Sequence, residues 1–260
     1  MIRYSNQEGL IPVSGIRFRK GQDSTIVLPE IAVGLFSTKL FNNVINEHPE
    51  FNPTKVAYLN CANFERDIYT IDYKGTQLTF FVAGIAGPLL SSDIQDLAKH
   101  GVKTFIIFGN CGVLDKNIED CSIIIPTKAF RDEGVSQHYV PDSETIDMNP
   151  KFIPEFEEVL KKYNMPHTKG YTWTTDGFYR ETVEKRDYYK SHGAVCVEME
   201  GAALAAVCKR QGLDYFTFYY AGDNLDAPTW DARSISCYVN FDKKKIVPIL
   251  AFELANKINK

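Results

Sequence analysis

The sequence predicts a single α/β domain that spans residues 1–260. Segments with the apolar patterns of strands alternate with segments of helical apolar spacing along the whole chain. No linker, internal repeat, low-complexity segment or shift in composition divides the 260 residues, a length that one α/β domain can reach. Hydrophobic residues make up 44% of the chain and charged residues 24%, which is enough apolar material for one large core.

The expected elements follow from apolar spacing and from the residues at their ends. Ser37 and Thr38 are suitable helix caps, and Lys74-Gly75 is suitable for a hairpin turn. The first half is expected to contain a polar arm or edge strand at 1–24, strands at 25–28 and 31–36, a helix through 40–45, strands at 56–61, 67–73 and 77–83, a helix through 94–98 and a buried strand at 102–108. The second half is expected to contain a short strand at 123–126, a polar segment at 130–139, a helix at 150–162, a strand at 171–175, a helix at 202–208, a strand at 215–221, a loop at 230–233 and a closing helix at 246–258.

The bulk properties argue against several classes of function. A net charge of −4 and a pI near 5.8 disfavour a protein that binds nucleic acid through its phosphate backbone. No apolar run approaches the roughly 18 residues that a membrane helix needs, so we expect no membrane partner. The N-terminus, Met1 to Glu8, has no apolar signal core, so we expect a cytoplasmic protein.

The cysteine and glycine patterns lack the common cofactor motifs. The six cysteines, at positions 61, 111, 121, 196, 208 and 237, have no CxxC spacing and lie mostly in apolar segments. We therefore expect reduced, buried thiols without a disulfide framework or a zinc site. The five histidines show no metal-ligand spacing, and no GxGxxG or Walker loop is present, which argues against dinucleotide and P-loop chemistry.

Three carboxylates mark the ends of two buried segments in the C-terminal half. Glu198 and Glu200 stand between an apolar strand and the helix at 202–208, and Asp223 follows the strand at 215–221. Such positions face the crevice in which α/β proteins bind small ligands. Carboxylates there can bind vicinal hydroxyl groups or transfer a proton. The alternative is a helix start that favours acidic residues through its dipole.

Two glycine-rich segments and two aromatic residues could complete a site. The segments 84–88 and 109–112 each follow a strand and let the backbone approach a ligand, although plain connections would look the same. The polar segment 130–139 is dense in functional groups, or else is a solvated loop with internal ion pairs. Phe178 and Tyr179 at a strand end could stack on a heterocycle or could plug the core.

The order of these motifs resembles that of nucleoside phosphorylases, in the branch that holds hexameric purine nucleoside phosphorylases, uridine phosphorylases and methylthioadenosine/adenosylhomocysteine nucleosidases. The similarity runs from about residue 25 to the C-terminus. The Val-Glu-Met-Glu motif with a later strand-end Asp is its specific part. The motifs are Gly84-Ile85-Ala86-Gly87-Pro88, Gly109-Asn110-Cys111-Gly112, Arg131-Asp132-Glu133-Gly134, Thr174-Thr175-Asp176 with Phe178-Tyr179, Val197-Glu198-Met199-Glu200 and Gly222-Asp223.

The resemblance implies one α/β domain whose mixed sheet forms a partial barrel flanked by helices. It also implies cleavage of the N-glycosidic bond of a nucleoside, with inorganic phosphate as co-substrate, no metal or organic cofactor, and a homo-oligomeric assembly. The implied roles are ribose binding by Glu200, Met199 and Glu198, base binding by Phe178, Cys111 and Gly112, phosphate binding by Gly109 and Asn110, and general acid catalysis at purine N7 by Asp223.

The chain departs from the family pattern at the phosphate side. Two arginines usual in these phosphorylases, one after the first strand and one before the glycines at 109–112, are absent, and Asn110 stands where Thr or Ser is usual. A phosphate dianion without guanidinium groups would be held more weakly. The cations that could replace them are Lys39, Arg17, Arg19 and Arg131.

The leading hypothesis is phosphorolysis of a purine nucleoside to the free base and ribose 1-phosphate. The residues after Phe178 lack the Gln and Arg with which uridine phosphorylases read uracil, and Asp223 suits a purine N7 better. The alternatives are a uridine phosphorylase, a hydrolytic nucleosidase and a non-catalytic nucleoside-binding protein. The nucleosidases place an early Glu beside the attacking water, for which this chain offers Glu30.

Overall fold

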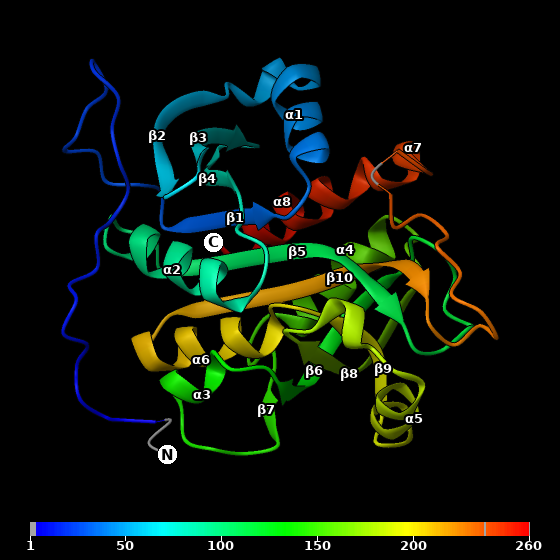
Figure 1. Ribbon diagram of the computed structural model, residues 1–260. Helices are drawn as coiled ribbons and strands as arrows, with labels where there is room; N and C mark the ends of the chain where they lie inside the picture. The colour runs from blue at the N-terminus through cyan, green and yellow to red at the C-terminus, as the bar shows by residue number, and fades with distance from the viewer. Residues whose placement is uncertain (1–3, 237, 260) are drawn as a thin grey trace.

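The computed structural model describes residues 4–236 and 238–259, in which ten strands form one mixed sheet with helices on both faces (Figure 1). The strands are β1 (Ile31–Leu35), β2 (Thr54–Cys61), β3 (Phe64–Tyr73), β4 (Thr76–Val82), β5 (Thr104–Val113), β6 (Ile123–Asp132), β7 (Thr145–Asp147), β8 (His167–Thr175), β9 (Ala194–Glu198) and β10 (Asp214–Asn224). The helices are α1 (Thr38–Glu47), α2 (Gly87–Ala98), α3 (Ser136–Tyr139), α4 (Ile153–Lys162), α5 (Val183–Ser191), α6 (Gly201–Gln211), α7 (Phe241–Lys244) and α8 (Ile246–Ile258), with short 3₁₀ turns η1 (Pro49–Phe51) and η2 (Phe178–Arg180).

Five of the strands close into a barrel. Along the sheet the order β10-β6-β8-β9-β5 is joined at its ends, because β10 also pairs with β5. The β10–β5, β6–β8 and β8–β9 pairs are parallel, whereas β10–β6 and β5–β9 are antiparallel. The strands β1, β4, β3 and β2 continue the sheet outward from β5. The predicted fold class, a mixed sheet forming a partial barrel, is confirmed.

Strand β5 is longer than the sequence predicted. The expected end at Phe108 is only the point at which β5 leaves β1, which pairs with it from Thr104 to Phe108. The segment 109–112, predicted as a loop, continues as strand because β10 stays alongside it and β9 pairs with it at Gly112 and Val113. The glycines there make room for side chains: a Cβ on Gly109 would lie 2.5 Å from the Phe36 ring.

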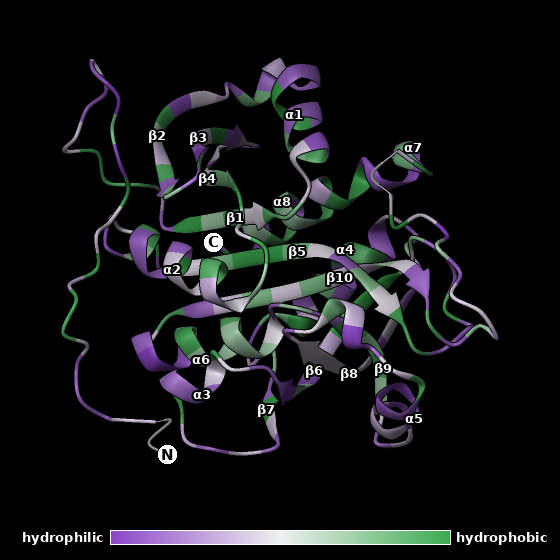
Figure 2. Ribbon diagram, viewed as in Figure 1, coloured by the Kyte–Doolittle hydropathy of each residue, from purple (hydrophilic) through white to green (hydrophobic). Residues whose placement is uncertain are grey.

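The parallel centre of the sheet, formed by β4, β1, β5 and β10, is buried on both faces, as is usual for parallel strands. On β5, Phe105 and Ile107 pack into the cluster that holds α2 and α6, and Ile106 and Phe108 pack into the cluster that holds α4 and α8. Helix α6 is buried from Gly201 to Cys208, and its small side chains let it pack closely against α2, α3 and β10. Figure 2 shows hydrophobic residues along β1 and β5 and hydrophilic ones on α3 and α5.

Most of the smaller expectations agree with the structure. Ser37 caps α1 through a hydrogen bond from the Leu40 amide, and the Lys74-Gly75 turn joins β3 to β4 with both φ angles positive. The segment 25–28 is not a strand, because its Leu28 amide bonds to the His100 carbonyl outside the sheet. The N-terminal segment is an arm with a single bridge, from Arg17 to Tyr58, and residues 1–3 lie outside the described part.

Two further expectations concern cysteines and membranes. The five described cysteines are free thiols, four of them buried, and Cys237 lies outside the described residues. Within the described residues, no helix combines the length and hydrophobicity that crossing a membrane would require.

Candidate functional site

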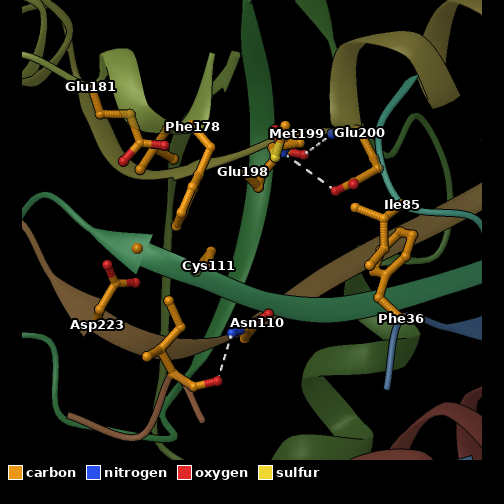
Figure 3. A pocket seen from close by; sticks show the side chains of 13 residues that line it. Phe36, Ile85, Asn110, Cys111, Phe178, Glu181, Glu198, Met199, Glu200 and Asp223 are labelled. Carbon is orange, nitrogen blue, oxygen red and sulfur yellow. Dashed lines mark hydrogen bonds between the residues drawn. The ribbon is translucent and has the colours of Figure 1, made fainter. Parts of the chain in front are cut away.

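A central cavity of about 170 Å³ opens where the C-terminal ends of β9 and β10 meet β5 (Figure 3). Asn110, Cys111 and Gly112 reach it from β5, and Asp223 reaches it from β10. Glu181, Phe178 and Asp223 stand on one side of it, and Glu200, Ile85 and Phe36 stand on the other. The complete lining is Phe36, Ile85, Asn110, Cys111, Gly112, Phe178, Glu181, Val197, Glu198, Met199, Glu200, Asp223 and Ile235.

Two larger cavities adjoin the central one. The α1-side cavity, of about 580 Å³, shares Phe36, Asn110 and Ile235 with it and is otherwise lined by Ser37, Thr38, Lys39, Asn42, Tyr220 and Tyr238. The Trp230-side cavity, of about 490 Å³, shares Phe178, Glu181 and Asp223 with it. Ligand sites usually measure ~300–1,000 Å³, so the central cavity requires its neighbours to hold a ligand of ordinary size.

The carboxylate of Glu198 connects β8 to the start of α6 through hydrogen bonds. Its Oε1 accepts hydrogen bonds from the hydroxyls of Thr172 (3.1 Å) and Thr174 (2.6 Å), and its Oε2 accepts the amides of Glu200 (2.7 Å) and Gly201 (2.6 Å). Four donors fill the acceptor positions of a carboxylate. Glu198 therefore has no acceptor left for a ribose hydroxyl, and its place is to fix the start of α6 rather than to bind the sugar as expected.

Glu200 lies at the N-cap of α6 and faces the central cavity. Its Oε1 accepts the Ala86 amide at 2.6 Å, and its Oε2 accepts the Met199 amide at 3.3 Å. Burial, followed by repulsion from Glu198, raises the pKa of Glu200 to about 8. Hydrogen-bond donors on a ligand would stabilise the charged form of this side chain.

A buried ion pair holds the loop that supports Glu200. Arg66 donates from both terminal nitrogens to Asp93, at 2.5 and 2.7 Å, and also to the Val82 carbonyl at 3.1 Å. Asp93 in turn accepts the amide of Gly84 at 2.7 Å. The glycine-rich segment 84–88 is thereby fixed at its start, two residues before the amide that Glu200 accepts. Sequence reasoning missed this pair because Arg66 and Asp93 lie 27 positions apart in ordinary polar surroundings.

Asp223 carries the carboxyl group on the opposite side of the cavity. It is 4% exposed, and its Oδ2 accepts a hydrogen bond of 2.7 Å from the Trp230 indole. Burial raises the pKa of Asp223 above its usual range, and the Trp230 bond limits this rise. A carboxyl group with a raised pKa beside a cavity is suited to proton donation.

Glu181 is a site residue that sequence reasoning missed. It follows the 3₁₀ turn η2 and lines the central cavity. Within the described part of the chain, its carboxyl group makes no hydrogen bond with another residue. Burial and then repulsion from Asp223 raise the pKa of Glu181 to about 7. The one signal in the sequence that could have identified it is its position three residues after Phe178, but acidic residues are common at such turns.

The remaining predicted residues fall into two groups. Phe178, Met199, Cys111, Gly112 and Asn110 all line the central cavity. Gly109 lies outside the lining and allows Phe36 to reach it, since a side chain at 109 would collide with that ring. Lys39 lines the α1-side cavity, where its ammonium lies 3.8 Å from the centre of the Tyr238 ring.

The three arginines considered for phosphate lie elsewhere. Arg131 is buried below the segment 130–139, where it donates to the Ser136 hydroxyl (2.8 Å), the Pro141 carbonyl (2.7 Å) and the Ser143 hydroxyl (2.7 Å), so its guanidinium holds that loop together. Arg19 pairs with Glu65 and Asp67 on the arm side. The Arg17 guanidinium donates to the Ser14 carbonyl at 3.5 Å. None of the three lines the central or the α1-side cavity.

A closed mixed barrel with buried carboxyl groups facing one another across a cavity at its strand ends is characteristic of an α/β protein that acts on a small polar molecule. Residues 33–240 match the family described as the phosphorylase superfamily. The chain belongs to this superfamily.

Two curated relatives carry more specific names. A guanosine phosphorylase from Halorubrum lacusprofundi is 29% identical over 162 residues, which are 60% of this chain and 64% of that protein. The chain thus spans just under two thirds of the length of this relative. A DeoD-type purine nucleoside phosphorylase from Alkaliphilus metalliredigens is 28% identical over 176 residues, which are 64% of this chain and 73% of that protein.

A solved structure shares the fold. The purine nucleoside phosphorylase of Toxoplasma gondii, crystallised with immucillin-H, superposes with a TM-score of 0.74 over 88% of this chain and 92% of that one. The sequences are 20% identical, so this likeness concerns the fold.

Proposed function

We propose that this protein cleaves the N-glycosidic bond of a purine nucleoside by phosphorolysis, releasing the free base and ribose 1-phosphate. The observation that carries the proposal is the placement of Asp223 and Glu200 on opposite sides of one cavity (Figure 3). A nucleoside has two ends that need carboxyl groups of different kinds. The base needs a proton donor, and the ribose diol needs an acceptor.

The proposed chemistry follows from how charge moves when the bond breaks. Cleavage of the C1′–N bond leaves positive charge on the ribose and negative charge on the departing purine. Asp223, whose pKa is raised by burial, would donate its proton to N7 of the purine and neutralise that charge. Phe178 would stack on the base, and Glu181 would face the edge of the base beside Asp223.

Glu200 and Met199 would hold the sugar. The Glu200 carboxylate would accept the two hydroxyls of the ribose, and Met199 would pack on its apolar face. The four bonds to Glu198 keep the Glu200 backbone in place, and the bond to the Ala86 amide orients its side chain. Anchoring the sugar restricts the approach of the second reactant to one direction.

The α1-side cavity would hold inorganic phosphate. It contains the start of α1, whose dipole and first-turn amides favour an anion, together with Lys39 and Asn110. Phosphate there would attack C1′ and stabilise the developing positive charge on the ribose. Lys39 would bind the phosphate in place of the arginines that are usual in nucleoside phosphorylases.

Hydrolysis is the second candidate, and one observation favours it. Among the described residues, the central and α1-side cavities are lined by one lysine and by no arginine. Water could therefore take the place of phosphate. Glu30, the acid considered for activating that water, is exposed at the far end of β1 and pairs with Lys103, which does not support this role.

Release of base from inosine, adenosine and uridine, each with and without phosphate, tests the proposal. We expect release from the two purine nucleosides only with phosphate, accompanied by ribose 1-phosphate. Asp223→Asn should lower kcat roughly tenfold or more, whereas Asp226→Asn, an acid that pairs with Lys190 outside the three cavities, should not. Release without phosphate would identify a hydrolase, a preference for uridine would overturn the base assignment, and binding without turnover would exclude an enzyme.

A further inference from the structure

The Trp230-side cavity has no part in the reaction described above. It is larger than the central cavity, at about 490 against 170 Å³, and joins it at Phe178, Glu181 and Asp223. It shares neither Met199 nor Glu200, so it lies beyond the base end of the site and away from the sugar end. A purine seated against Asp223 would therefore have open space next to it on this side.

The far wall of this cavity is apolar. It is formed by Val183, Leu225, Ala227, Pro228 and the ring of Trp230. Contact with these side chains favours a hydrocarbon group over a charged or strongly hydrated one.

Two polar side chains in the same lining, Arg186 and Thr182, already have partners within the protein. The Arg186 guanidinium donates to the Leu225 carbonyl at 2.9 Å and to Asp187 at 2.8 Å. The Thr182 hydroxyl accepts the Lys185 amide as the cap of α5. These existing bonds make either group a poorer partner for a charged substituent.

The geometry of a purine determines which atom faces this space. Its C6 substituent projects from the same edge of the ring system as N7. A base whose N7 meets Asp223 therefore directs its C6 substituent past that carboxyl group, toward the boundary that Asp223 and Glu181 form between the two cavities. The opening lies next to the one purine position that most readily carries a large group.

We propose that this site accepts purine ribosides that carry a bulky apolar substituent at C6, such as an N6-alkyl or N6-benzyl group, with the substituent in the Trp230-side cavity. This proposal rests on the proposed function and specifies its substrate class. The substituent would make its apolar contacts with Leu225, Ala227, Val183 and Trp230.

The test compares adenosine with N6-benzyladenosine at saturating phosphate. In the wild-type protein we expect kcat/KM for N6-benzyladenosine to equal or exceed that for adenosine. Ala227→Phe, which fills the cavity from the loop after β10, should lower kcat/KM for N6-benzyladenosine at least about tenfold and leave adenosine within about twofold, since pocket shape sets such ratios. Val183→Trp fills the same space from α5 and should act in the same way.

The matched control is a variant outside the cavity, and two outcomes would contradict the inference. Ala62→Phe makes the same change in the β2–β3 turn, far in sequence from the site, and should alter neither substrate. Rejection of N6-benzyladenosine by a wild-type protein that cleaves adenosine would overturn the inference while the proposed function stands. An equal loss for both substrates in Ala227→Phe and Val183→Trp would also overturn it.

Failure of the proposed function would be recognised separately. If no unsubstituted nucleoside were cleaved, calorimetric titration of both ligands would still examine the cavity. Tighter binding of N6-benzyladenosine than of adenosine, abolished by Ala227→Phe, would support the inference about the cavity. Equal or weaker binding of N6-benzyladenosine would contradict it.

Discussion

The indole Nε1 of Trp230 donates a hydrogen bond of 2.7 Å to Oδ2 of Asp223, so a loop residue holds the carboxyl group of the proposed acid. Trp230 itself is 61% exposed, while Asp223 is buried. The bond stabilises the ionised form of Asp223, in opposition to burial, which raises its pKa. The loop after β10 thereby influences how readily the proposed acid gives up its proton.

Replacing Trp230 with Phe should extend activity to higher pH. Loss of the indole donor removes an interaction that favours the charged carboxylate, so the pKa of Asp223 rises further and the acid stays protonated over a wider range. The measurement is the pH profile of kcat, whose alkaline limb should move upward. The control is Tyr179→Phe, which changes another aromatic residue in the lining of the Trp230-side cavity. A limb that stays in place would show that Asp223 does not govern it.

Nucleoside binding should strengthen as the pH rises from 6 to 8. The pKa of Glu200 is about 8, and the ionised form is the better acceptor for both ribose hydroxyls. The ionised fraction therefore grows with pH, KM falls toward pH 8, and the gain levels off above it. In Glu200→Gln the residue cannot titrate, so we expect a higher KM without this pH dependence. An unchanged slope in the variant would assign the titration to another group, with Glu181 as the first to test.

Lys39→Met should weaken phosphate specifically. The ammonium is the cation that lines the α1-side cavity, and charge-assisted contacts are worth ~1.5–3 kcal/mol, which corresponds to about tenfold or more in the KM for phosphate. KM for the nucleoside should change little, because Lys39 does not line the central cavity. Steady-state kinetics with each substrate varied in turn makes the distinction. The control is Lys103→Met, a surface lysine paired with Glu30, and equal effects of the two changes would remove Lys39 from the site.

Arg66→Met should destabilise the protein by about 3–5 kcal/mol, because Asp93 would be left buried with an uncompensated charge. Asp93 is only 2% exposed, and the pair is completed by two hydrogen bonds. Denaturant unfolding measures the loss, and Arg19→Met, which breaks an exposed ion pair, should cost far less. The double change Arg66→Met with Asp93→Asn should recover part of the loss. Full stability of the single variant would show that the pair is not needed to hold the glycine segment.

The sequence was sufficient for the fold class and for much of the pocket lining. The carboxylates of Glu200 and Asp223 could be located because each stands at the end of a strongly apolar segment, which is a local signal. The extension of β5 past Phe108 could not be predicted, because it depends on pairing with β10, which lies more than 100 residues later in the chain. Arg131 was assigned to phosphate from its charge, but its direction is set by partners at Pro141 and Ser143 that no spacing rule identifies. Glu181 could not be located either, because what marks it is its position beside Asp223 in the folded structure.

The closure of the barrel by β5 and β10 also has a consequence for the time at which the site comes into existence. During synthesis Glu200 emerges before Asp223, and the ring of strands stays open until residues 214–224 pair with residues 104–113. Pairings of such large sequence separation form late and slowly, because a long loop must be closed first. A nascent chain that ends before β10 therefore already contains Glu200 but lacks Asp223 on the opposite side of the cavity. The ability to bind should appear abruptly, with the last strand of the sheet.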